Sequence, residues 1–397
     1  MCADPRPNTP SASLYIHVPF CRSKCGYCAF FSEPLREGAL EAYLPLLLDE
    51  IALWGERLGR LNVPTVFFGG GTPSLLSPEH LERIMAALRK HFDLAPDAEI
   101  SMEANPESAS AEVLRTARAL GVNRLSLGVQ SFREEELSLL GRPHTARQAL
   151  EAFTRAKNAG FANVGLDLIW GLPGQREGQW LESLRRAVEL GPEHLSCYGL
   201  TLEPGTPLAE SLAEAPPESP GDQRSLPPER ELAHMYVHTG ELLEDAGYMQ
   251  YEISNYARLG HSCRHNLACW EGRDYLGLGP AAASTLGPLR WTNPEDLRSW
   301  AELVRTRQIG LGDRGGRETL SPETRAQERL MLALRTTKGL DLAEYRALSG
   351  LNLLTRHQKL IQALRQKELV RLHQGRLRLT RTGMLVSSSI IRALGFE

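Results

Sequence analysis

Three cysteines near the start of the chain, Cys21, Cys25 and Cys28, are separated by three residues and then by two. An apolar segment comes directly before them, so they are expected on a loop that follows a strand. Cysteine thiolates are the usual ligands of iron–sulfur clusters, and a tight loop can bring three of them to one face of a cubane. Three ligands leave one iron open, and an open metal position is where a substrate or cofactor binds. The spacing therefore predicts a 4Fe-4S cluster with one open iron.

The same cysteines could instead form a structural zinc site, or be buried thiols that lie together by chance. Structural zinc sites usually combine two separated pairs of ligands, and no second C-x-x-C pair follows the first one. Cys263, His265 and Cys269 could in principle supply distant ligands. The spacing favours iron–sulfur over zinc.

A second group of residues could form a pocket beside the cluster. Glycines at 69–71 let the backbone approach a ligand closely, the Thr72 hydroxyl can add a contact, and the Tyr27 ring can lie beside an adenine. A glycine run by itself is often only a turn, and a lone aromatic residue is often only packed. Four further side chains have the hydrogen-bonding capacity to hold ribose, carboxylate or adenosine groups: Glu103, Gln130, Arg142 and Asp167.

The elements that must position these residues alternate between short β-rich runs and amphipathic helical segments up to about residue 200, which is typical of parallel βα units. Helices are predicted over 79–91 and 146–159. Strands are predicted over 14–18, 65–68, 99–103, 124–129, 164–170 and 194–200. Six such units predict an α/β fold with an incomplete (β/α)6 barrel. Ligands bind at the carboxyl ends of the strands in such folds, where the candidate residues fall.

The remainder of the chain predicts two further parts. Residues 211–229 are rich in Pro, Ser and Glu, which predicts a flexible surface segment before a helix over 231–246. A helix-rich end follows, with helices over 323–335, 341–348 and 354–367 and a hairpin over 369–379 around Gln374 and Gly375. This order resembles an α+β winged-helix module. The expected domains are a barrel over 1–205, a barrel extension over 206–320 and an accessory domain over 321–397.

Composition and charge limit the classes of partner. The 397 residues include 42% hydrophobic and 23% charged residues, as in ordinary globular proteins. The net charge of −3 gives no bulk preference for nucleic acid, so no nucleic-acid partner is expected. The first residues lack the apolar core of a secretory signal, and the apolar stretch 44–54 is too short to span a bilayer. We expect a cytoplasmic protein, in which thiols stay reduced rather than forming disulfides.

The cysteine motif after the first strand and the Gly-Gly-Gly-Thr-Pro loop at 69–73 resemble the radical S-adenosylmethionine (SAM) superfamily. Segments 14–21, 128–132 and 167–174 resemble its oxygen-independent coproporphyrinogen III oxidase-like branch. The resemblance implies that SAM binds the open iron and is cleaved to a 5′-deoxyadenosyl radical, with flavodoxin or ferredoxin as reductant. It also implies SAM contacts at Tyr15, Tyr27, Gly70, Gly71, Thr72, Glu103, Gln130, Arg142 and Asp167.

Two functions compete within this branch. Oxygen-independent coproporphyrinogen III dehydrogenases, which form protoporphyrinogen IX, carry a further cysteine at the position of Phe30 and a longer N-terminal arm. Phe30 and the short segment before Cys21 are similar to the HemW group of heme chaperones. That resemblance implies a protein that binds heme and transfers it to a hemoprotein acceptor, which implies peripheral association with the membrane.

The HemW group also carries a His-Asn-x-x-Tyr-Trp motif linked to heme, which corresponds to residues 265–270 here. The resemblance implies that His265 ligates heme iron and that Trp270 packs against the macrocycle. Cys269 replaces the tyrosine, and Ala283 stands where relatives often carry histidine. Cys263 or Cys269 could ligate heme as a thiolate instead. A nucleic-acid function of the basic C-terminal segment is the weakest alternative, because its apolar residues are explained by packing.

Overall fold

The computed structural model describes residues 10–214, 225–311 and 317–395. The chain divides into two compact units, and it passes between them several times. The first unit comprises residues 1–166, 202–211 and 273–319, and the second comprises 167–201, 212–272 and 320–397. This division groups residues that are close in space, whereas the three domains expected from the sequence are consecutive segments of the chain. No helix in the described part of the chain is long and apolar enough to cross a membrane.

The first unit is built on a mixed sheet in the order β14-β13-β12-β11-β1-β4-β5-β6. Its parallel strands are β1 (Ser13–Val18), β4 (Asn62–Gly70), β5 (Asp93–Ala104), β6 (Arg124–Gln130) and β11 (Tyr275–Leu278). Antiparallel strands extend it through β12 (Ala283–Leu286), β13 (Leu289–Thr292) and β14 (Glu318–Thr319). Parallel register brings the carboxyl ends of β1, β4, β5 and β6 to one edge of the sheet.

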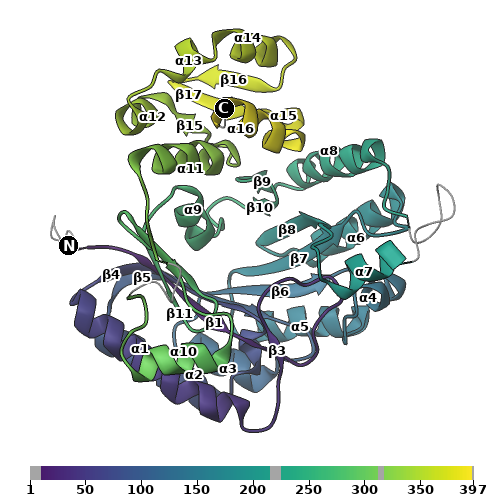
Figure 1. Cartoon of the computed structure of the whole chain (residues 1–397). Helices are drawn as coiled ribbons and strands as arrows, with labels where there is room; N and C mark the ends of the chain where they lie inside the picture. The colour runs from purple at the N-terminus through teal and green to yellow at the C-terminus, as the bar shows by residue number, and fades with distance from the viewer. Residues whose placement is uncertain (1–9, 215–224, 312–316, 396–397) are drawn as a thin grey trace. The chain divides into compact units, whose positions relative to one another are not determined.

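Helices pack along this sheet, and Figure 1 shows α1, α2, α3 and α10 together on one side of it. The helices of the unit are α1 (Ala39–Leu58), α2 (Pro78–His91), α3 (Ala111–Ala119), α4 (Glu134–Leu139), α5 (Ala146–Asn158), α7 (Pro207–Glu214) and α10 (Leu297–Arg305). The side chains of Ser77 and Thr145 cap the N-termini of α2 and α5, and Pro78 begins α2. These caps fix where the two helices begin, and the helices predicted over 79–91 and 146–159 are confirmed.

The second unit begins within β7 (Val164–Trp170), which the contacts divide after Leu166. Its elements up to the C-terminal part are α6 (Glu177–Leu190), β8 (His194–Gly199), α8 (Glu229–Asp245), β9 (Met249–Gln250), β10 (Asn255–Ala257) and α9 (Arg264–Trp270). β10 pairs antiparallel with both β8 and β9. The α6 helix packs on α8, where the buried Trp180 Nε1 donates to Thr239 Oγ1 at 2.7 Å. With β1, β4, β5 and β6, the strands β7 and β8 complete the six strands expected from the sequence.

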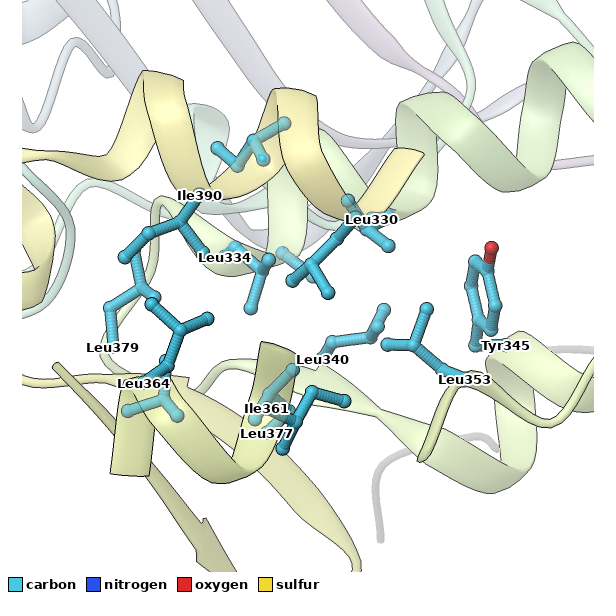
Figure 2. Packing of buried hydrophobic residues seen from close by; sticks show 14 of the residues in the cluster. Leu330, Leu334, Leu340, Tyr345, Leu353, Ile361, Leu364, Leu377, Leu379 and Ile390 are labelled. Carbon is cyan, nitrogen blue, oxygen red and sulfur yellow. The ribbon is translucent and has the colours of Figure 1, made fainter. Parts of the chain in front are cut away.

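The C-terminal part of the second unit has its own core, which Figure 2 shows closely packed. Leucines dominate it, and Leu330, Leu334, Leu340 and Leu377 are fully buried. A small sheet in the order β15-β17-β16 accompanies the helices. The elements are α11 (Pro322–Leu334), β15 (Leu340–Asp341), α12 (Leu342–Ser349), α13 (Leu353–Arg356), α14 (Gln358–Gln366), β16 (Val370–His373), β17 (Arg376–Leu379), α15 (Arg381–Leu385) and α16 (Ser387–Gly395).

The predicted hairpin is confirmed, because β16 and β17 pair through a turn with positive φ at Gln374 (50°) and Gly375 (72°). The single helix expected over 354–367 is wrong. The chain leaves the helical conformation at His357, where φ is −112° and ψ is 33°, and two helices result. Neither proline nor glycine marks this break in the sequence.

The expected flexible segment over 211–229 is wrong at both ends. Residues 211–214 belong to α7, which begins with Pro207 and is anchored where the Leu208 amide donates to the Gly26 carbonyl at 2.8 Å. At the other end α8 begins at Glu229. Residues 215–224 of that segment lie outside the described part of the chain.

Candidate cofactor site and the α9 segment

The cysteine loop leaves the short strand β2 (Phe20–Cys21) and is held by backbone hydrogen bonds. The Cys28 amide donates to the Cys25 carbonyl at 3.2 Å, and the Gly26 amide donates to the Leu140 carbonyl at 3.2 Å. Cys25 is buried, whereas Cys21 and Cys28 are partly exposed. The loop is therefore fixed to the rest of the unit while two of its cysteines remain partly exposed.

The three thiols influence one another electrostatically. Burial, and then the neighbouring Cys25 and Cys21, raise the pKa of the Cys28 thiol. In the described residues, no three His, Cys, Asp or Glu side chains are close enough together to hold a single metal ion. A cubane takes one thiolate per iron and is larger than one ion, so its ligands need not converge on one point. Three thiols on one loop fit that donor set.

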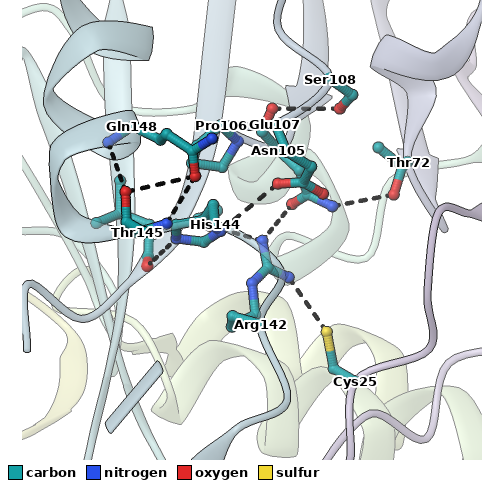
Figure 3. Close-up of polar contacts among 12 residues, drawn as sticks. Cys25, Thr72, Asn105, Pro106, Glu107, Ser108, Arg142, His144, Thr145 and Gln148 are labelled. Carbon is teal, nitrogen blue, oxygen red and sulfur yellow. Dashed lines mark hydrogen bonds and ion pairs between the residues drawn. The ribbon is translucent and has the colours of Figure 1, made fainter. Parts of the chain in front are cut away.

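A chain of polar contacts links two of the cysteines through three other elements, as Figure 3 shows in part. Arg142 Nη1 donates to Cys25 Sγ at 3.3 Å, and its Nη2 donates to Asn105 Oδ1 at 2.7 Å. Asn105 Nδ2 donates to Thr72 Oγ1 at 3.0 Å, and Thr72 Oγ1 donates to Cys21 Sγ at 3.5 Å. Thr72 and Asn105, which follow β4 and β5, and Arg142, in the loop between α4 and α5, thus support the cysteine loop.

Arg142 places a positive charge beside the thiols. Burial alone would lower its pKa, but attraction from Tyr27, Cys25 and Glu107 raises the pKa above the usual value. Burial likewise opposes the charge of Glu107, and yet hydrogen bonding to His144 lowers the pKa of this carboxyl. His144 Nδ1 lies 3.5 Å from Glu107 Oε2. The result is a half-buried cation that stabilises negative charge on cysteine sulfur.

The glycine loop is required by the chain's own packing. Gly70 has a φ of 107°, and a Cβ there would lie 2.7 Å from the His17 ring. A Cβ on Gly71 would lie 2.5 Å from the Phe20 carbonyl oxygen. His17 in turn contacts the Tyr15 hydroxyl, with 3.0 Å between Nδ1 and the oxygen. The close approach at these glycines is therefore to β1 and β2, the strands that lead into the cysteine loop.

The remaining candidate residues lie at strand ends or beside the loop. Burial, and then the charge of Glu103, raise the pKa of Tyr15, and burial raises the pKa of Tyr27. Gln130 has a φ of 64°, which is uncommon for a residue other than glycine and marks the end of β6. Asp167 belongs to the second unit, where burial and then its charge raise the pKa of Cys197. The first unit thus contains every candidate SAM contact except Asp167.

Asn105 was missed from the sequence although it connects Arg142 to Thr72. Its amide group can accept from one side chain and donate to another, which the two contacts require. The signal was its place directly after β5 and before Pro106, at the same sheet edge as the other candidates.

The α9 segment has a different environment. His265 is 5% exposed, and Cys263 caps the helix by accepting from the Asn266 amide at 3.5 Å. Burial raises the pKa of Cys269 to about 11, so its thiol stays protonated at neutral pH. The guanidinium of Arg335 lies over the Trp270 ring, 5.3 Å from its centroid. The candidate heme residues are therefore largely covered.

Ala283, at the position where histidine was expected, lies in β12 and pairs with Thr292. It belongs to the first unit, whereas α9 belongs to the second. An alanine side chain offers no ligand to a metal, so α9 supplies the candidate heme ligands.

Comparison with protein families gives two matches. The profile of the Radical SAM superfamily matches residues 15–187, and that of the HemN C-terminal domain matches residues 320–386. The first match contains the three cysteines and Arg142. The second contains most of the core of the C-terminal part.

Similar proteins match over nearly the whole chain. "Heme chaperone HemW" of Mycobacterium tuberculosis (strain H37Rv) is 37% identical over 98% of this chain and 96% of its own. The Bacillus subtilis protein of that name is 33% identical over 96% and 98%, and the Escherichia coli protein is 42% identical over 69% and 70%. Among solved structures, Escherichia coli coproporphyrinogen III oxidase (HemN), described as a radical SAM enzyme, superposes with a TM-score of 0.82. It is 26% identical, and the match covers 98% of this chain and 91% of that one.

Proposed function

Because the chain belongs to the HemW heme chaperone family of the radical SAM superfamily, we propose that it binds heme and transfers it to acceptor hemoproteins. The observation that carries the proposal is the similarity to proteins named heme chaperones over nearly the entire length. It includes the α9 motif with His265 as well as the cysteine loop. The chain's own departures, Cys269 and Ala283, concern the details of the heme site.

Within this function, Cys21, Cys25 and Cys28 are the proposed ligands of a 4Fe-4S cluster, which supplies one-electron chemistry toward SAM when bound. Arg142 holds a positive charge 3.3 Å from the Cys25 sulfur, where it can offset the negative charge that thiolate ligands bring to a cluster. The Thr72 hydroxyl donates to the Cys21 sulfur at 3.5 Å. Both contacts support the proposal that the loop is prepared for a cluster.

The proposed SAM contacts are Tyr15, Tyr27, Gly70, Gly71, Thr72, Glu103, Gln130, Arg142 and Asp167. Two of them already have partners that limit what they can offer. Thr72 donates its hydroxyl proton to Cys21 and accepts from Asn105, which leaves one lone pair. Arg142 is directed at Cys25 and Asn105. Their proposed role is therefore to orient the site.

His265 is the proposed axial ligand of heme. A neutral imidazole is a common ligand of heme iron, whereas a thiol with a pKa of about 11, as at Cys269, must first lose a proton. His265 is 5% exposed, so heme can reach it only after α9 or its cover moves. The proposal includes that local opening.

The partners of this function are also proposals. The acceptor is a hemoprotein at the membrane, which the chain meets from the cytoplasm by peripheral contact. The reductant is a flavodoxin or ferredoxin. The domains follow the segments 1–205, 206–320 and 321–397, with the cluster in the first and His265 in the second.

Conversion of coproporphyrinogen III to protoporphyrinogen IX is the second candidate. The fold similarity to HemN favours it, but one fold can host several functions. Phe30 is 72% exposed and places a phenyl ring where the dehydrogenases carry a cysteine. Since phenylalanine cannot ligate metal or transfer a proton, this position favours the chaperone.

Heme transfer tests the proposal directly. Purified protein is loaded with hemin, freed of excess ligand and mixed with apomyoglobin, and the Soret spectrum follows the transfer. We expect stoichiometric loading, transfer to apomyoglobin, and loss of loading in His265→Ala. A wild-type chain that binds no hemin, or holds it without release, contradicts the chaperone function. Arg346→Met, on the exposed surface of α12, is the control variant.

A further inference from the structure

Positive side chains from the C-terminal part of the second unit contact the last turn of α9 and the residue after it. The Arg335 guanidinium lies over the Trp270 ring, 5.3 Å from its centroid. Arg329 Nη1 donates to the Trp270 carbonyl at 3.5 Å, and Lys338 Nζ lies 2.8 Å from Glu271 Oε1. Cations stabilise the C-terminal end of a helix, where carbonyl groups lack partners within the helix. Three of them meet here on two neighbouring residues.

The backbone that carries Arg335 is itself fixed. The Ile253 amide donates to the Arg335 carbonyl at 3.0 Å, and the Thr337 amide donates to the Tyr251 carbonyl at 3.1 Å. Glu252 and Thr336 form an antiparallel bridge between these two bonds. This strand-like pairing leaves Arg335 little freedom, so its guanidinium is held at one place relative to α9.

Arg335 also faces a buried carboxylate. Glu252 is 1% exposed, and burial raises its pKa to about 7 even though hydrogen bonds and the charge of Arg335 oppose this shift. The guanidinium therefore contacts an aromatic ring and acts through its charge on an acidic group. A planar guanidinium can stack on the ring while its charge acts on the carboxylate, which a lysine ammonium does less well.

We infer that Arg335 is a positioning residue for the porphyrin site, which acts through Trp270 to fix the helix that carries His265. The inference rests on the proposed heme function. Trp270 ends α9 and His265 lies in its first turn, so in this short helix the orientation of one end sets the orientation of the other. No contact between Arg335 and heme is required.

The test is a double-mutant cycle read out by hemin affinity. Arg335→Met and Arg335→Lys are titrated with hemin in the wild-type background and in a Trp270→Leu background. Arg335→Met is expected to weaken hemin binding about fivefold to tenfold in the wild-type background and to have no further effect beside Trp270→Leu. Arg335→Lys is expected to recover part of the loss. Arg346→Met should bind like the wild type.

Either of two results would overturn this inference and leave the proposed heme function in place. One is hemin binding by Arg335→Met that is as tight as, or tighter than, that of the wild type. The other is an equal loss in both backgrounds, because a residue that acts through Trp270 cannot act without it. A wild-type chain that binds no hemin overturns the proposed function as well.

A measurement without hemin tests the contact between Arg335 and Trp270 by itself. The fluorescence attributable to Trp270, taken as the difference between wild type and Trp270→Leu, should change in Arg335→Met. Arg335→Met should still unfold cooperatively on heating, as Arg346→Met does, which shows that the variant folds. An unchanged Trp270 signal contradicts the stacking contact itself.

Discussion

The cysteine loop and the α9 segment differ in how their candidate ligands are exposed and held in place. Around the loop, side chains that follow β4, β5 and α4 already form one connected set of contacts, and two of the three cysteines are partly exposed. In α9 the candidate ligand His265 is buried, and cations from the C-terminal part hold the helix. Under the proposed function, the loop is prepared for a compact, permanent cofactor, whereas α9 must open to admit a large, transferable one.

The largest expected effect comes from the cysteine loop. Cys25→Ser should remove the cluster, because a serine hydroxyl is a poor iron ligand and only two thiolates would remain. Iron and sulfide are measured after anaerobic reconstitution. Cys269→Ser, in α9, is the matched control and should retain both. Unchanged iron and sulfide in Cys25→Ser would remove the basis for calling this loop the cofactor site.

Removal of the half-buried Arg142 cation should have the next largest effect. Arg142→Met leaves Glu107 and the Cys25 thiol without their positive partner, so the free energy of unfolding should fall by about 3 to 5 kcal/mol. Arg142→Lys should lose less, since it keeps the charge but not the two-pronged geometry. Chemical denaturation measures both variants. A loss below that of a surface substitution would show that the polar contacts do not stabilise the loop.

Glu252 makes the stability of the second unit depend on pH. Its folded pKa of about 7 lies above the ordinary value of 4.5, so the folded state binds the proton more tightly than the unfolded state. Stability from this group is therefore present at low pH and is lost as the pH rises from about 4.5 to about 7, by about 3 kcal/mol. Thermal unfolding of Glu252→Gln should lack this decline.

Glu50 is the matched control for that measurement. It is buried in the first unit, and burial raises its pKa to about 7 even though Gly279, Trp300 and Asn293 donate hydrogen bonds to it. Glu50→Gln should remove a similar decline from the unfolding of the first unit and leave the Trp270 signal of α9 unchanged. An identical pH profile for Glu252→Gln and the wild type argues against the buried charge beside Arg335.

The smallest effect is expected at Thr72. Thr72→Val keeps the shape but leaves the Asn105 amide without its acceptor, which should cost about 1 to 2 kcal/mol of stability. Loss of iron to a chelator should also become faster, because Cys21 loses a hydrogen bond. Thr154→Val, on the exposed face of α5, is the control. Equal rates of iron loss in the two variants would show that the contact does not extend to the cluster ligand.

The sequence predicted the parts of the fold that depend on local patterns. Capped helices and apolar strands were found. However, β4 and β5 begin earlier than expected, and their additional residues include Pro64 and Pro96. A register shift between Val63 and Thr65 accommodates the first of these prolines. Such an irregularity depends on the partner strand, which a single segment of sequence does not specify.

The candidate sites show the same limit, because the sequence predicted their local motifs and not their distant contacts. The cysteine spacing is local and was read directly, whereas the connection of Arg142 to Thr72 through Asn105 joins three separate loops, which follow β4, β5 and α4. The cover of Trp270 by Arg335 likewise joins distant segments. Sequence therefore identified the residue types, and only the fold gave their partners and burial.

Anaerobic turnover tests the central claim most directly. Reconstituted protein is supplied with reductant, SAM and coproporphyrinogen III, and protoporphyrinogen IX is followed over many equivalents of cluster. A heme chaperone with Phe30 in place of the further cysteine should form no product although its cluster is complete. Sustained formation of protoporphyrinogen IX would contradict the chaperone function and identify the chain as a dehydrogenase.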